Sequence, residues 1–220
     1  MPLPLLDGPR LAPQSGRPAK QLIVFLHGYG ADGHDLIGIG HQWGSHLPDA
    51  AFVSPHAPEP CGMAPVGRQW FHLTLRDPSE YWRGVVAARP ALDAFLNAEL
   101  QRVGLKDKDL VLVGFSQGTM MALHCGLRRA RAPAGIVAYS GLLAGPEHLQ
   151  KEISGRPPVL LAHGSQDEVV PFAVMAIAET ALKAAGVPVV SHVAKGLGHG
   201  IDSTGLALGL AHCQQVLGSN

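Results

Sequence analysis

Three residues in this chain could together activate a serine as a nucleophile. Ser116 lies in Gly-Phe-Ser-Gln-Gly, Asp167 in His-Gly-Ser-Gln-Asp-Glu-Val-Val-Pro, and His199 in Gly-Leu-Gly-His-Gly. A serine hydroxyl is nearly inert at neutral pH, so it needs a base to take its proton and an acid to orient that base. The order serine, acid, histidine is the one expected when the serine lies on a sharp turn between a strand and a helix. The sequence therefore predicts nucleophilic catalysis by these three residues.

The residues around Ser116 favour such a turn. The apolar run Asp109–Val113 precedes it and a helix-compatible run follows it, while Gly114 and Gly118 flank the serine where side chains would block the tight backbone path. The chain holds 27 glycines, so the pentapeptide alone is weak evidence. The strand before the turn and the helix after it make the prediction specific.

Other residues compete for the roles of acid and base. Glu168 and Asp202 are alternative acids, and Asp167 could serve only as a turn or capping residue. The chain has 12 histidines, but most fit the role of base less well than His199 does. We expect His192 inside a strand and His212 deep in the last helix, and His163 precedes the acid.

The reaction also needs donors for the oxygen that becomes negative, typically two backbone N–H groups. One donor is expected from Gln117, directly behind the nucleophile. The second is expected in the glycine-rich loop Leu26-His-Gly-Tyr-Gly-Ala-Asp-Gly33, where we choose the backbone N–H of Tyr29. An ordinary glycine-rich turn is the alternative for this loop.

Apolar runs alternate with helix-compatible stretches along the chain. Near-continuous Val, Ile and Leu runs are typical of a parallel sheet buried on both faces, so we predict an α/β fold with a mainly parallel open sheet covered by helices on both faces. The predicted strands are Gln21–Leu26, Ala50–Ser54, Asp109–Val113, Gly135–Tyr139, Pro158–Ala162 and Val187–Val193. The predicted helices are Asp35–His46, a run through Leu92–Val103 with Pro90 at its first position, Gln117–Arg129, Phe172–Ala185 and about His199–Leu217.

Composition narrows the function classes. A chain of 220 residues fits one domain, 1–220, without a large cap domain. The 17 basic residues balance the 17 acidic ones, which argues against nucleic-acid binding. We expect a reducing, cytoplasmic compartment, because three cysteines at irregular spacing favour no disulfide framework and we see no signal peptide. No apolar run approaches the ~18 residues of a membrane span.

The stretch Pro55–Pro78 is too long for an ordinary connection. It follows the second predicted strand at its carboxyl end, where ligands bind in open parallel sheets. Long ordered loops are often functional, so we expect this one to contribute to the site.

Four of these motifs, in register, resemble the small bacterial carboxylesterase and lysophospholipase-like family of α/β-hydrolases, which includes acyl-protein thioesterases. The likeness covers about Gln21 to Val216 and comprises the Leu-His-Gly-Tyr-Gly-Ala-Asp-Gly loop, the serine turn and the turns around the acid and the histidine. It implies Ser116, Asp167 and His199 as catalytic residues, with Tyr29 and Gln117 as oxyanion donors.

The resemblance also implies a substrate groove beside the long loop. Trp70 and Phe71 are candidate substrate contacts, with plain core as the alternative, and Leu142 and Leu143 are further candidates for the groove wall. Family members often carry Asp where this chain has His72, so the contribution of that Asp is in doubt here.

We expect neither a cofactor nor a metal. Four histidines in the first part of the chain lack the i, i+4 spacing with a matching acid that a zinc motif needs, and Cys-x-x-Cys does not occur. These histidines are His27, His34, His41 and His46.

The sequence thus predicts a serine hydrolase of carboxylic esters, with short-chain acyl esters first and thioesters or lysophospholipids as alternatives. An acyltransferase using the same residues, a non-catalytic binding protein of the same fold and, more weakly, a dienelactone-hydrolase-like enzyme are the rival hypotheses. The expected partner is a small-molecule ester, without nucleic acid or stable membrane insertion, and a homodimer is left open.

Overall fold

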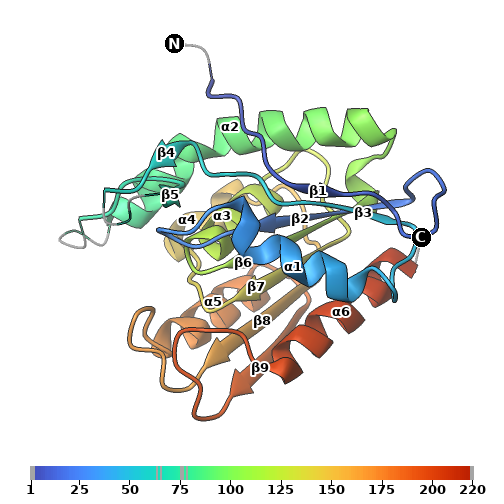
Figure 1. Cartoon of the computed structure of the whole chain (residues 1–220). Coiled ribbons are helices and arrows are strands. Elements are labelled where there is room, and N and C mark those ends of the chain that lie inside the picture. Colours follow the sequence, from blue (N-terminus) through green and yellow to red (C-terminus); the bar gives the residue numbers. More distant parts are fainter. Residues whose placement is uncertain (1–2, 63, 65, 75–76, 78, 219–220) are drawn as a thin grey trace.

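A seven-stranded, mainly parallel sheet forms the centre of the computed structural model, which describes residues 3–62, 64, 66–74, 77 and 79–218 (Figure 1). Its strand order is β1-β3-β2-β6-β7-β8-β9, with every neighbouring pair parallel except β1 and β3. The strands are β1 (Arg10–Leu11), β2 (Gln21–Leu26), β3 (Ala50–Val53), β6 (Leu110–Phe115), β7 (Gly135–Tyr139), β8 (Val159–Gly164) and β9 (Val189–Ala194).

All six predicted strands are confirmed, two with the predicted bounds and four with ends that differ by one or two residues. Three further strands escaped prediction. These are β1 at the edge of the sheet and a separate hairpin of β4 (Glu59–Pro60) with β5 (Arg68–Gln69) inside the long loop. Each is two residues long, too short to leave an apolar pattern in the sequence.

Helices cover both faces of the sheet, as predicted. One buried apolar cluster joins the sheet to α1 and α6, and a second joins its other face to α2, α3, α4 and α5. Figure 1 shows α1 and α6 together on the near face. The helices are α1 (Gly33–Trp43), α2 (Ser79–Val103), α3 (Gln117–Gly126), α4 (Pro146–Glu152), α5 (Ala173–Ala184) and α6 (Ser203–Gly218), with a short 3-10 turn at Asp107–Asp109. None of those in the described chain is long and apolar enough to cross a membrane.

The prediction for Pro90 was wrong. We expected it to begin a helix, whereas α2 begins at Ser79 and contains Pro90 in its interior. Proline removes the hydrogen bond to the carbonyl four residues earlier, at Val86. Pro90 and Val86 are both exposed, so water can satisfy that carbonyl. The end of the helix was predicted correctly, because Gly104 has a φ of 72° just after Val103.

Candidate active site

Ser116 lies on a sharp turn between β6 and α3, as predicted. Its φ of 54° and ψ of −118° are unusual for a residue with a side chain, and such strain is common at functional positions. The two glycines are required by close packing: a Cβ on Gly114 would lie 2.5 Å from the Gly118 carbonyl oxygen, and one on Gly118 would lie 1.8 Å from that of Leu26. The serine side chain is nearly buried, with 8% of the residue exposed.

Asp167 and His199 are hydrogen-bonded, although 32 residues separate them. His199 Nδ1 lies 2.8 Å from Asp167 Oδ2, while Asp167 Oδ1 accepts hydrogen bonds from the backbone N–H groups of Val169 and Val170 at 3.0 and 2.9 Å. Burial favours the neutral acid and is the largest single influence on its pKa. The hydrogen bonds from His199 and the two amides together outweigh it, so the pKa of Asp167 is lowered.

The loops that carry the acid and the base are joined to each other. The amide of Gln166 donates to the Leu197 carbonyl at 2.9 Å, and a Cβ on Gly164 would lie 2.2 Å from the Gly198 oxygen. Ser140, which follows β7 with a φ of 43°, donates its hydroxyl to the Gly200 carbonyl at 2.8 Å. These contacts fix the turn around His199, and sequence reasoning did not single out Ser140.

The base also lies against the serine turn. The ring centroids of His199 and Phe115, the residue before Ser116, are 4.9 Å apart. The structure therefore gathers the three sequence-distant segments at the carboxyl ends of β6, β8 and β9. The alternative residues are placed less favourably, since Glu168 is exposed and Asp202 Oδ2 lies 3.5 Å from His192 Nε2.

The predicted oxyanion donors lie beside the nucleophile. A Cβ on Gly28 would be 3.2 Å from the Cβ of Ser116, so the loop that continues into Tyr29 passes next to the serine. Gln117 begins α3, where the first N–H groups of a helix have no partner within the helix. Among the described residues, neither the Tyr29 amide nor the Gln117 amide has a hydrogen-bond acceptor. A hydrogen bond with the Cys61 side chain raises the pKa of the Tyr29 hydroxyl.

The side chain of Gln117 holds the long loop. Its Oε1 accepts from the Trp70 amide at 2.9 Å and its Nε2 donates to the Phe71 carbonyl at 2.8 Å. The Trp70 indole N–H donates to the His27 carbonyl at 2.9 Å. Within the predicted loop 55–78, residues 63, 65, 75–76 and 78 lie outside the described part. The loop is therefore tied to both oxyanion segments by hydrogen bonds that the sequence pattern did not reveal.

The four candidate groove residues divide into two pairs. Trp70 and Phe71 are 1% and 4% exposed and pack in the core, which fits the alternative reading of this pair. Leu142 and Leu143 line an apolar groove of about 440 Å³ together with Trp82, Val174 and Ile177. His72, in place of the family's Asp, is exposed.

The groove adjoins the segment that passes the Ser116 backbone. A Cβ on Gly141, the residue before Leu142, would lie 2.7 Å from the Ser116 carbonyl oxygen. At the other side of the groove the rings of Trp82 and His148 stack with centroids 4.1 Å apart. Leu142 therefore connects the groove to the segment beside the serine.

A cluster of possible metal ligands lies near the oxyanion loop. One donor atom from each of Asp32, His34 and His56 falls within 4.8 Å of the others. The N–H of Gly33, however, donates to His56 Nδ1 at 3.1 Å, which occupies the lone pair a metal would use. The cluster also lies at the positive end of α1, where a cation is disfavoured.

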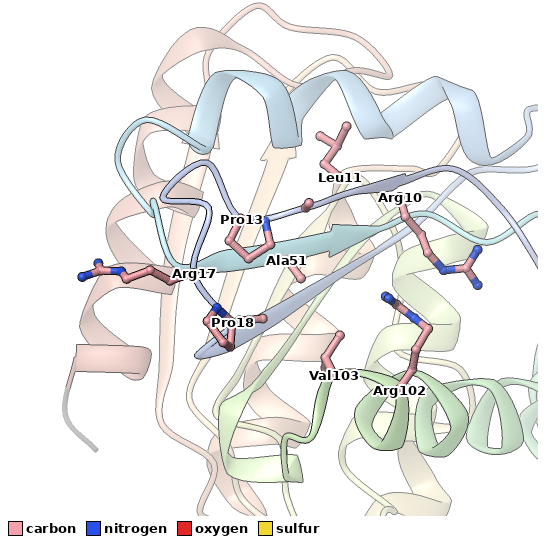
Figure 2. A pocket seen from close by; sticks show the side chains of 10 residues that line it. Arg10, Leu11, Pro13, Arg17, Pro18, Ala51, Arg102 and Val103 are labelled. Carbon is pink, nitrogen blue, oxygen red and sulfur yellow. The ribbon is translucent and has the colours of Figure 1, made fainter.

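A second hollow, of about 490 Å³, lies at the amino ends of β2 and β3 (Figure 2). In Figure 2, Arg10 and Arg102 approach each other on one side, and Arg17 extends away from them. Arg10 and Arg102 both bind Glu99, at 2.7 and 2.8 Å, and Arg17 binds Asp49 at 2.8 Å. All three guanidinium groups are thus neutralised by carboxylates.

Comparison with known proteins decides the family. The sequence profile of the phospholipase/carboxylesterase family matches residues 12–217. The chain belongs to this family. A relative within it, esterase YpfH of Escherichia coli strain K12, is 29% identical over 201 residues, which cover 91% of this chain and 85% of that protein. Acyl-protein thioesterase 1 of Saccharomyces cerevisiae is 32% identical over 181 residues, covering 76% and 78% of the two chains.

Solved structures agree with the family. The crystal structure of esterase PE8 superposes with a TM-score of 0.94 at 44% identity, covering 97% of this chain and all of the other. Arabidopsis thaliana SOBER1 gives 0.77 at 26% identity, covering 90% and 100%. The fold is therefore the α/β-hydrolase fold, and the protein is a serine hydrolase of the carboxylic-ester class.

Proposed function

We propose that the protein cleaves carboxylic esters through an acyl-enzyme on Ser116, with His199 as base and Asp167 as the acid that orients it. The observation that carries this proposal is the 2.8 Å hydrogen bond between His199 Nδ1 and Asp167 Oδ2, beside the strained serine turn. With Nδ1–H donating to the carboxylate, Nε2 is left to accept the serine proton.

The reaction proceeds in two acyl transfers. Ser116 Oγ attacks the ester carbonyl while His199 takes its proton, and the amides of Tyr29 and Gln117 donate to the resulting oxyanion. His199 then gives the proton to the leaving alcohol as the ester C–O bond breaks. Water, deprotonated by His199, attacks the acyl-enzyme, and the carboxylic acid leaves as Ser116 recovers its proton.

Replacement of the nucleophile tests this mechanism. We expect Ser116→Ala to lower kcat on a nitrophenyl short-chain ester by ~10³-fold or more, because the catalytic residues act as a unit. A fluorophosphonate probe should label the wild type and not this variant. Ser154→Ala, at an exposed serine, is the matched control and should behave as wild type. Turnover close to wild type in Ser116→Ala would rule the mechanism out.

We propose that the acyl chain of the substrate lies in the groove of Leu142 and Leu143. The support is the apolar lining and the position of Leu142 directly after Gly141, which lies against the Ser116 backbone. Short acyl esters are the preferred substrates, and the yeast relative named acyl-protein thioesterase 1 makes thioesters the first alternative to test.

Blocking the groove should change the chain-length preference. Ile177 lines the groove and is 55% exposed, so Ile177→Trp should obstruct the groove with little effect on the core. We expect kcat/KM for octanoyl esters and thioesters to fall by about tenfold or more, equivalent to two buried methylenes at ~0.8 kcal/mol each, and acetyl esters to be unaffected. Val190→Trp, at an exposed position on β9, is the control. An equal loss on both chain lengths would contradict this location.

We also propose a single catalytic domain over residues 1–220 that works in the cytoplasm. The support for a reducing compartment is that Cys61, Cys125 and Cys213 are all free and buried. The expectations about nucleic acid, membrane insertion and a homodimer remain predictions.

A further inference from the structure

A second histidine lies against the acid of the site. His163 is in β8, four residues before Asp167, and is 3% exposed. Its Nε2 is 2.8 Å from the Val170 carbonyl oxygen and 3.2 Å from Asp167 Oδ2, the same oxygen that accepts from His199. Asp167 Oδ2 therefore lies between two imidazoles, one on each side of the turn.

The contacts of His163 fix where its proton sits. Both groups beside Nε2 are acceptors, so Nε2 carries the hydrogen and donates it to the Val170 carbonyl, with the carboxylate oxygen at the side of this bond. A buried N–H next to a carboxylate oxygen stabilises one orientation of the carboxylate, because rotation of the group would move that oxygen away from the N–H.

The same imidazole also holds the loop that binds the other carboxylate oxygen. Both backbone polar groups of Val170 are hydrogen-bonded: its carbonyl accepts from His163, and its N–H donates to Asp167 Oδ1 at 2.9 Å. His163 therefore connects the rigid strand β8 to the backbone that cradles Asp167. The edge-on contact between His163 and the ring of Phe172, with centroids 6.1 Å apart, packs it from a third side.

We propose that His163 is a positioning residue of this esterase, which holds Asp167 in the single orientation that hydrogen-bonds His199 Nδ1. This inference rests on the proposed function, because it assigns a role relative to the acid of that mechanism. A purely structural role is the competing explanation. An apolar side chain would fill the same buried space, so the two explanations differ in whether the N–H donor matters.

Three substitutions separate them. His163→Leu removes the donor, His163→Asn is too short to place a donor where Nε2 was, and His163→Gln can place its amide N–H there. We expect kcat to fall by about 10- to 100-fold in the first two with KM within about twofold, since misplacing a catalytic group by about 1 Å can have such an effect. His163→Gln should recover to within about threefold of wild type.

His212 provides a matched control. It is also a buried histidine, and its Nε2 lies 3.3 Å from the Pro158 carbonyl oxygen. Pro158 precedes β8 at its opposite end, roughly 20 Å from Gly164 at a rise of about 3.3 Å per residue. His212→Leu should lower the melting temperature as His163→Leu does and leave kcat unchanged.

A spectroscopic measurement makes the test independent of turnover. The low-field proton resonance of His199 Nδ1–H, assigned by its loss in His199→Gln, should persist in Ser116→Ala and His163→Gln and disappear in His163→Leu and His163→Asn. If Ser116→Ala remains active, the proposed function fails whatever this resonance does. The positioning role is overturned if folded His163→Leu or His163→Asn keeps the resonance and a kcat within about threefold of wild type, if His163→Gln does not recover, or if His212→Leu loses as much kcat. Should His163→Leu not fold, the Asn and Gln pair decides.

Discussion

Two hollows of similar volume lie at opposite ends of the parallel strands. The hollow beside Leu142, of about 440 Å³, lies at the carboxyl ends, here called the active edge, and the hollow beside Arg10, of about 490 Å³, lies at the amino ends, here called the arginine edge. They differ in whether the polar groups near them already have partners within the protein. Around the larger hollow the arginines are paired with carboxylates, and the acid Glu99 binds two of them. At the carboxyl ends of the strands, where the smaller one lies, the amides of Tyr29 and Gln117 have no acceptor among the described residues, next to a serine in a strained conformation.

This difference shows that volume is a poor guide to function in this molecule. Charged groups that satisfy each other have little left to offer a ligand, and a pair with a buried carboxylate such as Glu99 acts mainly on stability. Oriented donors without an acceptor are costly to maintain in a folded protein, and they are retained where a reaction uses them. This contrast supports the proposal that one edge carries the chemistry, while the other contributes stability.

Replacement of the Asp167 carboxylate by an amide, at the active edge, should produce the largest loss of kcat. Asp167→Asn keeps the size of the side chain but replaces the negatively charged carboxylate, which accepts a hydrogen bond from His199 Nδ1, by a neutral amide. We expect kcat to fall by about 10³- to 10⁴-fold, measured with nitrophenyl esters, because the wrong tautomer of His199 is favoured. Asp202→Asn and Glu168→Gln, at the two alternative acids, should lower kcat by less than about threefold. A larger loss in either of them would transfer the role of acid to that residue.

The corresponding exchange at the arginine edge should affect stability alone. Glu99 is 4% exposed and accepts hydrogen bonds from Arg10 and Arg102, which hold its pKa low against the opposing effect of burial. Glu99→Gln should lower the free energy of unfolding by about 2 kcal/mol, less than for a fully buried pair because both arginines are partly exposed. Urea denaturation measures this change, and kcat should remain that of the wild type. A drop in kcat above about threefold would mean that the two edges are coupled.

Moderate acid should reveal a further difference between the two edges, in how stability depends on pH. His124 is 2% exposed behind Trp82, and burial, together with the charges of Arg128 and Arg89, lowers its pKa to about 3. The unfolded chain takes up the proton first, near pH 6.5, so stability is full above that pH and declines as the pH falls from 6.5 toward 3. The expected loss is about 1.4 kcal/mol per pH unit.

Denaturation of wild type and His124→Leu at pH 7, 6 and 5 measures this slope. The variant should lose less stability between pH 6.5 and 5, although His27 and His212, whose pKa values burial also lowers, retain part of the dependence. At the arginine edge, hydrogen bonds from Ser15, Arg17 and Lys20 lower the pKa of Asp49 to about 2, so this group does not titrate in the same range. Equal slopes of unfolding free energy against pH in the two proteins would show that protonation of His124 does not destabilise the fold.

Five of the strands, β2, β3, β6, β7 and β8, could be predicted because they are buried on both faces and therefore read as continuous apolar runs, whereas the mostly exposed β9 was recognised by its valines. The edge strand Arg10–Leu11 could not, since two residues held by an antiparallel pairing leave no pattern. The start of α2 was missed because proline usually begins a helix, and only its exposed position makes Pro90 acceptable in the interior.

The geometry of the proposed acid and base agrees with the sequence prediction, because residue type and chain order restrict that choice strongly. The residues that support them were invisible for a different reason. Ser140, His163 and the side chain of Gln117 act through backbone carbonyls and amides, which every sequence offers at every position. His163 had one available signal, its place at the end of a buried strand four residues before the acid.

The amide side chain of Gln117 grips the long loop only by main-chain atoms of Trp70 and Phe71. These hydrogen bonds do not depend on most of the loop's side chains, so a rim residue such as His72 can be exchanged while the path of the chain past the serine is kept. For engineering, this suggests grafting new rim sequences between the fixed anchor at Phe71 and the start of α2, an exchange that alters the surface a substrate meets first and leaves the reactive centre unchanged.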